Sequence, residues 1–140
     1  MSRTRTGLRI RGQRGNPIVR EALKRFARWL RQEYSFPIRV PVYLNYHHSF
    51  ITIEGEKASA SFFEPYDRTV EPYIRIATGD YDDLVSELGK NNALACYICS
   101  LSHEILHYQQ WITNGCTSEK GIGRKSVAIL RRYEKTVDEP

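Results

Sequence analysis

The chain has 140 residues, of which 41% are apolar and 26% are charged, and its formal net charge at pH 7 is +5. This length is typical of a single domain, and the apolar fraction is sufficient for a sizeable core. The sequence contains no apolar run of the roughly 20 residues that a membrane-spanning helix needs, and no apolar segment of a secretory signal follows the N-terminal basic residues. We therefore expect a cytoplasmic protein without a membrane segment, whose three cysteines are reduced thiols.

The positive charge is concentrated at the N-terminal end of the chain. Residues 1–39 carry eleven Arg and Lys against two Glu, whereas residues 40–140 carry ten basic against fourteen acidic side chains. Such asymmetry is found in proteins that contact nucleic acids, and also where a basic helix face is simply solvated. The solvated face is the favoured interpretation, because aromatic residues do not alternate with the basic ones along the sequence, as a stacking platform requires.

The first 40 residues predict an arm followed by a helix. Residues 1–16 are rich in Arg and Gly and predict a basic flexible arm, whereas 17–134 are expected to form the single folded domain and 135–140 a polar tail. Pro17 suits the first turn of a helix and Asn16 its cap. Apolar residues then recur every three or four positions, which predicts an amphipathic helix.

Four β-rich segments follow this helix. They cover residues 36–44, 50–54, 57–63 and 72–78, and Pro or Gly residues interrupt or separate them. Because the four segments come together and do not alternate with helices, they predict one small sheet of three or four strands and an α+β fold.

Three helices are predicted after the sheet. A short helix over 82–88 precedes a long one that extends from Asn91 or Asn92 to Thr113, where Asn114 and Gly115 stop it. Thr117 or Ser118 can then cap a last helix.

The long helix contains the sequence His103-Glu104-Ile105-Leu106-His107 within an apolar segment. Residues four apart lie on the same face of a helix, so both imidazoles can point at one position. Glu104 lies about 100° around the helix, where it can reach a water held at that position. This is the HExxH pattern, in which two His bind zinc and the Glu acts as general base. A chance HxxxH pair on a surface helix is the alternative.

A catalytic zinc needs a third protein ligand and leaves one position open for water. Glu119 is the best downstream candidate, because a short loop would bring the start of the last helix beside His107. The alternative is a first-turn Glu that only interacts favourably with the helix dipole. Gly121 and Gly123 are unfavourable within a helix, and one use for them is a close approach of two helices beside the metal.

The three cysteines allow different interpretations. Cys96 and Cys99 lie on one helical stripe with His103 and His107, but that stripe is about 16 Å long, too long for a single ion to contact both ends. We therefore expect Cys96 and Cys99 to pack in the core. Cys116 lies in the loop after the long helix, where a thiolate could reach the open zinc position and block it.

The pattern of His103, Glu104 and His107, followed by Glu119, resembles that of the gluzincin class of zinc metallopeptidases. The small size and the order helix, sheet, active-site helix and glutamate helix are similar to the minigluzincins. The resemblance implies a zincin-like domain that hydrolyses a peptide or protein substrate. In it, His103, His107 and Glu119 hold the zinc, and Glu104 takes a proton from the attacking water. It also implies an edge strand beside the cleft, for which 72–78 is the candidate.

Two questions remain open at this stage. The resemblance implies an oxyanion-stabilising Tyr or His, and Tyr73, Tyr108 and Tyr133 are equal candidates. The other open question is a different class of function: a non-enzymatic binding protein whose basic arm and helix contact nucleic acid or an acidic partner.

Overall fold

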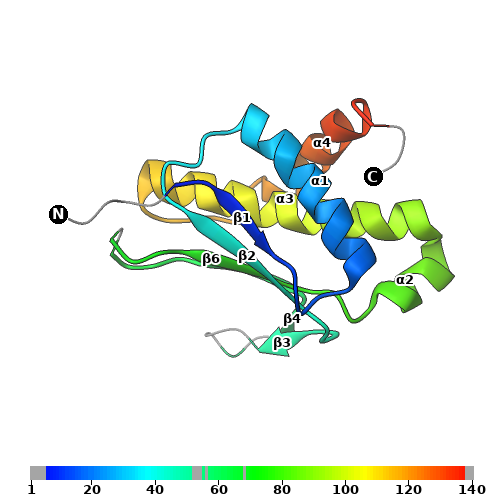
Figure 1. Ribbon diagram of the computed structural model, residues 1–140. Helices are drawn as coiled ribbons and strands as arrows, with labels where there is room; N and C mark the ends of the chain where they lie inside the picture. Colours follow the sequence, from blue (N-terminus) through cyan, green and yellow to red (C-terminus); the bar gives the residue numbers. More distant parts are fainter. Residues whose placement is uncertain (1–5, 52–54, 56, 68, 138–140) are drawn as a thin grey trace.

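The computed structural model describes residues 6–51, 55, 57–67 and 69–137. Over these residues the chain has a mixed α+β fold, with α1, α3 and α4 on one side of a small sheet (Figure 1). None of these helices combines the length and the apolar character that crossing a bilayer requires. In chain order the elements are β1 (Leu8–Arg11), α1 (Pro17–Glu33), β2 (Val40–Asn45), β3 (Phe50–Ile51), β4 (Lys57–Ala58), β5 (Ala60–Phe63), β6 (Tyr73–Ala77), α2 (Tyr81–Leu88), α3 (Lys90–Asn114) and α4 (Ile122–Glu134).

The main sheet has the strand order β1-β2-β6-β5. Its first three strands are parallel, and β5 is antiparallel to β6 at one edge. Helix α1 therefore forms the crossover between the parallel strands β1 and β2, an arrangement that needs a helix or a long connection. The α+β class and the small sheet were predicted from the sequence, but the two parallel pairings, β1 with β2 and β2 with β6, were not.

The prediction of a flexible arm over 1–16 is wrong for the residues of β1. Leu8 is fully buried, and Leu8 and Ile10 lie opposite Val40 and Val42 in the neighbouring strand. The Arg31 guanidinium of α1 donates two hydrogen bonds, of 3.1 and 2.7 Å, to the Leu8 carbonyl. Two alternating apolar residues are too few to predict a strand from the local sequence. The strand forms because these residues pair with β2. Residues 1–5 lie outside the described part of the chain.

The strands near the cleft also differ from the prediction. The strand predicted over 72–78 is β6, which pairs with β2 on one side and β5 on the other, so it is not an edge strand. The edge is β5 instead. The strand predicted over 57–63 is divided into β4, which pairs with β3, and β5, which joins the main sheet. Of the strand predicted over 50–54, only Phe50 and Ile51 are described.

Helix α1 begins where the sequence predicts. The Asn16 side-chain oxygen accepts hydrogen bonds from the backbone N–H groups of Ile18 and Val19, at 2.8 and 3.2 Å, and Pro17 occupies the first turn. One face of the helix is buried. Its members are Val19, Ala22, Leu23, Phe26, Ala27 and Leu30.

Helix α3 is the central element of the helical layer and packs against α1, α2, α4, β5 and β6. It ends at Gly115, which adopts a left-handed conformation (φ +78°) and donates its N–H to the Trp111 carbonyl at 2.8 Å. The buried Tyr108 accepts a hydrogen bond from the Ile38 N–H at 3.1 Å and donates one to the Ile38 carbonyl. The Trp111 indole donates to the Pro65 carbonyl at 3.1 Å. These contacts fix the helix against the loops around the sheet.

Two smaller predictions about the helical half have different outcomes. The short helix predicted over 82–88 is confirmed as α2. The prediction that Cys96 and Cys99 pack in the core is wrong, because Cys96 is exposed and Cys99 is half-buried, both as free thiols. Of the predicted polar tail, 135–140, Val137 packs against the core, and 138–140 lie outside the described residues.

Candidate metal centre

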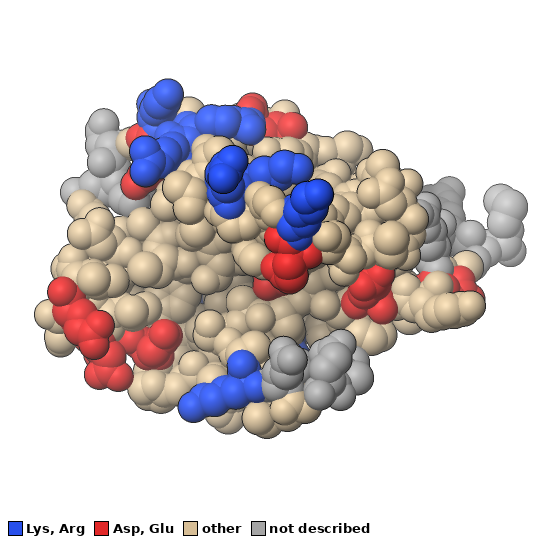
Figure 2. Space-filling model, turned by 180° about the vertical axis from the view of Figure 1, so that it is seen from behind, with Lys and Arg blue, Asp and Glu red and all other residues tan. Residues whose placement is uncertain are grey.

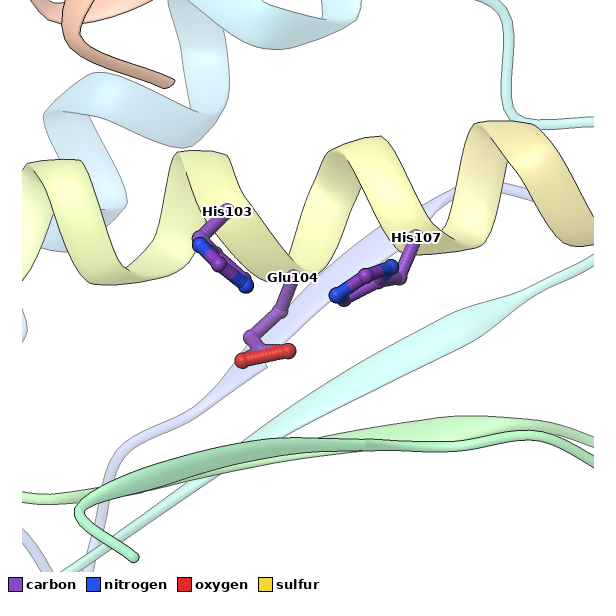
Figure 3. A group of neighbouring side chains, drawn as sticks. All are labelled: His103, Glu104 and His107. Atoms are coloured by element: carbon purple, nitrogen blue, oxygen red, sulfur yellow. The ribbon is translucent and has the colours of Figure 1, made fainter. Parts of the chain in front are cut away.

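Helix α3 places three side chains of the HExxH pattern together. His103, Glu104 and His107 project from the helix on the side of the strands, with the Glu104 carboxylate between the two imidazoles in the view of Figure 3. The imidazole centroids are 4.9 Å apart, and one possible ligand atom of each residue lies within 4.8 Å of the others. Glu104 and His107 are buried and His103 is half-buried. The two imidazoles therefore face one position at the wall of the helical layer.

Glu119 reaches both imidazoles from the loop between α3 and α4. Its Oε2 lies 3.0 Å from His103 Nε2, and its Oε1 lies 2.7 Å from His107 Nε2. The prediction that Glu119 occupies the first turn of the last helix is wrong, since α4 begins at Ile122. The carboxylate nevertheless lies within hydrogen-bonding distance of both imidazoles.

Gly121 and Gly123 do not lie at a close approach of two helices, which was the use proposed for them from the sequence. A Cβ atom added at Gly121 or Gly123 would meet nothing within 4 Å, so neither glycine permits a close approach of two helices. Gly121 has φ +75°, a left-handed conformation that turns the chain into α4. It shapes the turn after Glu119 and is not a packing residue.

Gln110 is a site residue that the sequence analysis missed. Its amide nitrogen donates to the Ser118 carbonyl, and its amide oxygen accepts from the Ser118 N–H, both at 3.0 Å. The same oxygen lies 3.0 Å from Nδ1 of His107. Its position three residues after His107 on α3 was the available signal, because such residues share a helix face. Gln110 thus connects a histidine of the motif to the residue before Glu119.

These hydrogen bonds determine which nitrogen of His107 carries a proton. The two bonds to Ser118 fix the orientation of the Gln110 amide, so its oxygen can only accept from Nδ1. A neutral His107 would then turn the lone pair of Nε2 toward Oε1 of Glu119, at 2.7 Å. Two lone pairs at that distance repel each other. The contact is favourable only with a proton or a metal cation between the two atoms.

The geometry and the donor set fit a zinc ion. Zinc binds His nitrogen and carboxylate oxygen at about 2.0–2.2 Å in a tetrahedral arrangement, so its ligand atoms lie roughly 3.3 Å from one another. The distances of 3.0 and 2.7 Å from the Glu119 oxygens to the two Nε2 atoms are a few tenths of an ångström shorter. A small outward movement of the carboxylate would make room for the ion. His103, His107 and Glu119 could therefore hold a metal.

The environment of Glu104 changes its acidity. Burial raises the pKa of Glu104 to about 7, and the negative charge of Glu119 adds to the increase, whereas His107 opposes it. A carboxyl group with this pKa can accept and release a proton near neutral pH, as a general base must.

A cavity of about 450 Å³ lies between these side chains and the edge of the sheet. All four residues of β5 line it, together with Tyr73 and Arg75 of β6. Among the three oxyanion candidates, Tyr73 is therefore the one in the cavity. Tyr108 is buried against Ile38, and Tyr133 packs on the aromatic rings of α1.

The loop that carries Glu119 is fixed to the other wall of this cavity. The Thr117 hydroxyl donates to Glu64 Oε2 at 2.9 Å, just beyond the end of β5. Thr117 and Glu119 line the cavity, whereas Cys116 is exposed and is not among its lining residues. The structure therefore does not bring the Cys116 thiol to the two imidazoles.

No protein-family model, no curated protein and no solved structure matches the chain. The assignment of a function therefore depends on the geometry of this site.

Proposed function

We propose that the protein is a zinc-dependent metallopeptidase with a zincin-like domain. His103, His107 and Glu119 would hold the zinc, and Glu104 would be the general base. One observation supports this proposal most strongly: the Glu119 carboxylate faces Nε2 of both imidazoles, and the orientation of His107 requires a proton or a metal cation between Nε2 and the carboxylate.

The chemistry of the site follows from its residues. A zinc ion at these ligands would act as a Lewis acid on a peptide carbonyl and on a water molecule. Glu104 would take a proton from the attacking water and deliver it to the leaving amine. The Tyr73 hydroxyl would donate a hydrogen bond to the developing oxyanion.

The edge strand β5 favours an extended peptide as the substrate. Its side toward β6 is paired, and no strand of the described residues pairs with its other side, where backbone N–H and C=O groups could pair with another strand. Main-chain hydrogen bonds along such an edge bind a peptide irrespective of its sequence. Because β5 lines the same cavity as His103 and His107, a peptide added there would lie beside the proposed base.

Metal analysis tests the ligand set directly. The purified protein is expected to bind about one equivalent of zinc, and Glu119→Ala to lose most of it, since two imidazoles alone leave the site incomplete. Glu134→Ala is the matched control, because Glu134 is an exposed carboxylate at the end of α4. Full zinc content in Glu119→Ala would contradict the proposed site.

Cleavage is measured separately on a mixture of unstructured peptides, with the products identified by mass spectrometry. Zinc-loaded protein is expected to cleave internal peptide bonds, and treatment with a chelator to abolish cleavage. If the protein binds one equivalent of zinc but cleaves no peptide, the proposed metal site is supported and the proposed peptidase activity is rejected.

A further inference from the structure

A second concave surface lies at the opposite edge of the sheet, along β1 and α1. Two cavities, of about 680 and 300 Å³, share Ile10, Arg11 and Lys24 among their lining residues and thus form one continuous groove. We name it the basic groove. Its cationic members include Arg9, Arg11, Arg14, Lys24, Arg28 and Arg31.

The charge of the basic groove is largely uncompensated. Among the described residues that line it, Glu21 is the only carboxylate, and it lies 3.7 Å from the Arg20 guanidinium and 3.9 Å from the Lys24 ammonium. Partial burial, followed by the charges of Arg9 and Arg28, lowers the pKa of Arg31. These cations repel one another, and an anion in the groove would relieve that repulsion.

An exposed aromatic ring lies among these cations. Tyr43 of β2 lines the larger cavity and is 44% exposed, whereas its neighbours Val42 and Leu44 face the core. In the sheet, Tyr43 lies opposite Arg11 on one side and opposite Arg75 on the other. The sequence indicated no alternation of aromatic and basic residues, but the strand register creates it in space.

We propose that the basic groove binds single-stranded nucleic acid, with its phosphates on the cations of β1 and α1 and one base stacked on Tyr43. Guanidinium groups predominate in the groove, and their planar forks pair with phosphate oxygens. Stacking on Tyr43 needs a base whose face is free, as in a single strand and not in a duplex. An acidic peptide would use the cations and would gain nothing comparable from the ring.

This inference is independent of the proposed peptidase. The strand order places β1 and β5 at opposite edges of the sheet, and the cations of the basic groove do not line the cavity of the metal centre. The Tyr43 ring makes an edge contact with Tyr73 of that cavity, with the two ring centroids 6.0 Å apart. Substitutions of the groove cations are therefore expected to leave zinc content and peptide cleavage unchanged, and Tyr43→Ala is expected to leave zinc content unchanged.

The test measures binding of the full chain to fluorescein-labelled oligo-dT and oligo-U of about 12 nucleotides by fluorescence anisotropy. Unlabelled duplex DNA of the same length and polyglutamate serve as competitors. We expect both single strands to bind, with log Kd rising by about 0.7 per phosphate contact for each unit of log salt concentration. Competition by the duplex or by polyglutamate as strong as that by the single strand would overturn the proposal.

Two sets of variants separate specific binding from general attraction. Arg11→Ala with Arg28→Ala should reduce the salt slope by about 1.4, at about 0.7 per phosphate contact. Lys125→Ala with Arg131→Ala removes two exposed charges from α4, at the top of the molecule in Figure 1, and should change little. The face seen in Figure 2 also carries Lys and Arg side chains over its upper part, so general attraction would not be limited to the basic groove. An equal loss in both pairs would show that net charge alone is responsible.

Tyr43 provides the test of stacking. Tyr43→Ala should weaken binding of the single strands about 5- to 150-fold, and Tyr43→Phe should retain it, because stacking requires the ring and not the hydroxyl. Tyr46→Ala is the control, since Tyr46 is 62% exposed and does not line the groove. Unchanged affinity in a folded Tyr43→Ala protein would refute the stacking and with it the single-stranded ligand.

Discussion

The two edges of the sheet each lie beside a helix, but the side chains that surround them have opposite charge. At one edge, β5 and α3 border a cavity that is lined by the buried Glu104 carboxylate and the buried His107 imidazole. At the other edge, β1 and α1 border a groove lined by cations. Burial raises the pKa of Glu104 to about 7, and partial burial, followed by the charges of Arg9 and Arg28, lowers the pKa of Arg31. The two edges thus differ in the charge of the side chains that surround them, which come from the strand as well as from the neighbouring helix.

The largest expected effect concerns Glu104, the proposed base at the edge formed by β5. Glu104→Gln should reduce the rate of peptide cleavage by about 10²- to 10⁴-fold, because the amide cannot accept a proton from water. Zinc content should remain that of the wild type, since Glu104 is not one of the proposed ligands. The measurements are kcat/KM and metal content, with Glu87→Gln on the exposed face of α2 as the control. Undiminished cleavage would remove Glu104 from the mechanism.

The next prediction concerns Leu8, the buried residue of β1 at the edge that carries the basic groove. Leu8→Ala should lower the free energy of unfolding by about 2–5 kcal/mol, because the side chain is fully buried between β1 and the helical layer. Arg9→Ala, on the exposed side of the same strand, should stay within about 0.5 kcal/mol. Urea denaturation measures both. A Leu8→Ala protein as stable as the wild type would mean that β1 does not contribute to the fold.

A third prediction concerns the pH dependence of the free energy of unfolding that the Glu104 carboxyl causes. The pKa of Glu104 is raised from an ordinary value of 4.5 to about 7 in the folded protein, so folding favours the protonated carboxyl. The resulting stabilisation is complete below about pH 4.5 and is lost as the pH rises through 7. Metal-free protein should therefore lose up to about 3 kcal/mol of stability from this group between pH 5 and pH 8.

Glu104→Gln is the matched test of this pH dependence. Without a titrating group at position 104, the free energy of unfolding of the chelator-treated variant should depend less on pH between 5 and 8 than that of the wild type. The same slope in both proteins would assign the pH dependence to other groups in the cavity.

The smallest expected effect concerns the orientation of a ligand. Gln110→Leu removes the acceptor for Nδ1–H of His107 and both bonds to Ser118, and it should weaken zinc binding about 10- to 100-fold. Gln109→Ala removes a neighbouring side chain that bonds to the Ser35 carbonyl instead, and should leave the affinity unchanged. Competition with a chromophoric chelator measures both. Equal affinities in all three proteins would show that the hydrogen bonds of Gln110 do not position the ligand.

What could be predicted from the sequence was local. The beginning of α1 at Asn16 and the end of α3 at Gly115 depend on residues within one turn, and the HExxH spacing alone places two imidazoles on one helix face. These features need no information about the rest of the chain, and the structure contains them where they were expected.

What could not be predicted depends on distant pairing. Leu8 becomes a buried strand residue only because Val40 lies opposite, 32 positions away in the sequence, and β5 becomes the edge only because β6 pairs with β2. Glu119 reaches the imidazoles from a loop, whose shape follows from Gly121 and from Ser118 contacts that helix periodicity does not describe. Metal binding, peptide cleavage and nucleic-acid binding remain predictions.

The pair of hydrogen bonds between Gln110 and Ser118 has a consequence for metal capture. The loop residue next to Glu119 is held by the side chain of the helix, so the carboxylate is already beside the two imidazoles when the chain is folded. Ordering a backbone residue costs about 1–2 kcal/mol of conformational entropy. Because that cost arises during folding, the proposed metal would bind to a loop that is already ordered. Its binding free energy would then not be reduced by the entropy cost of ordering the loop.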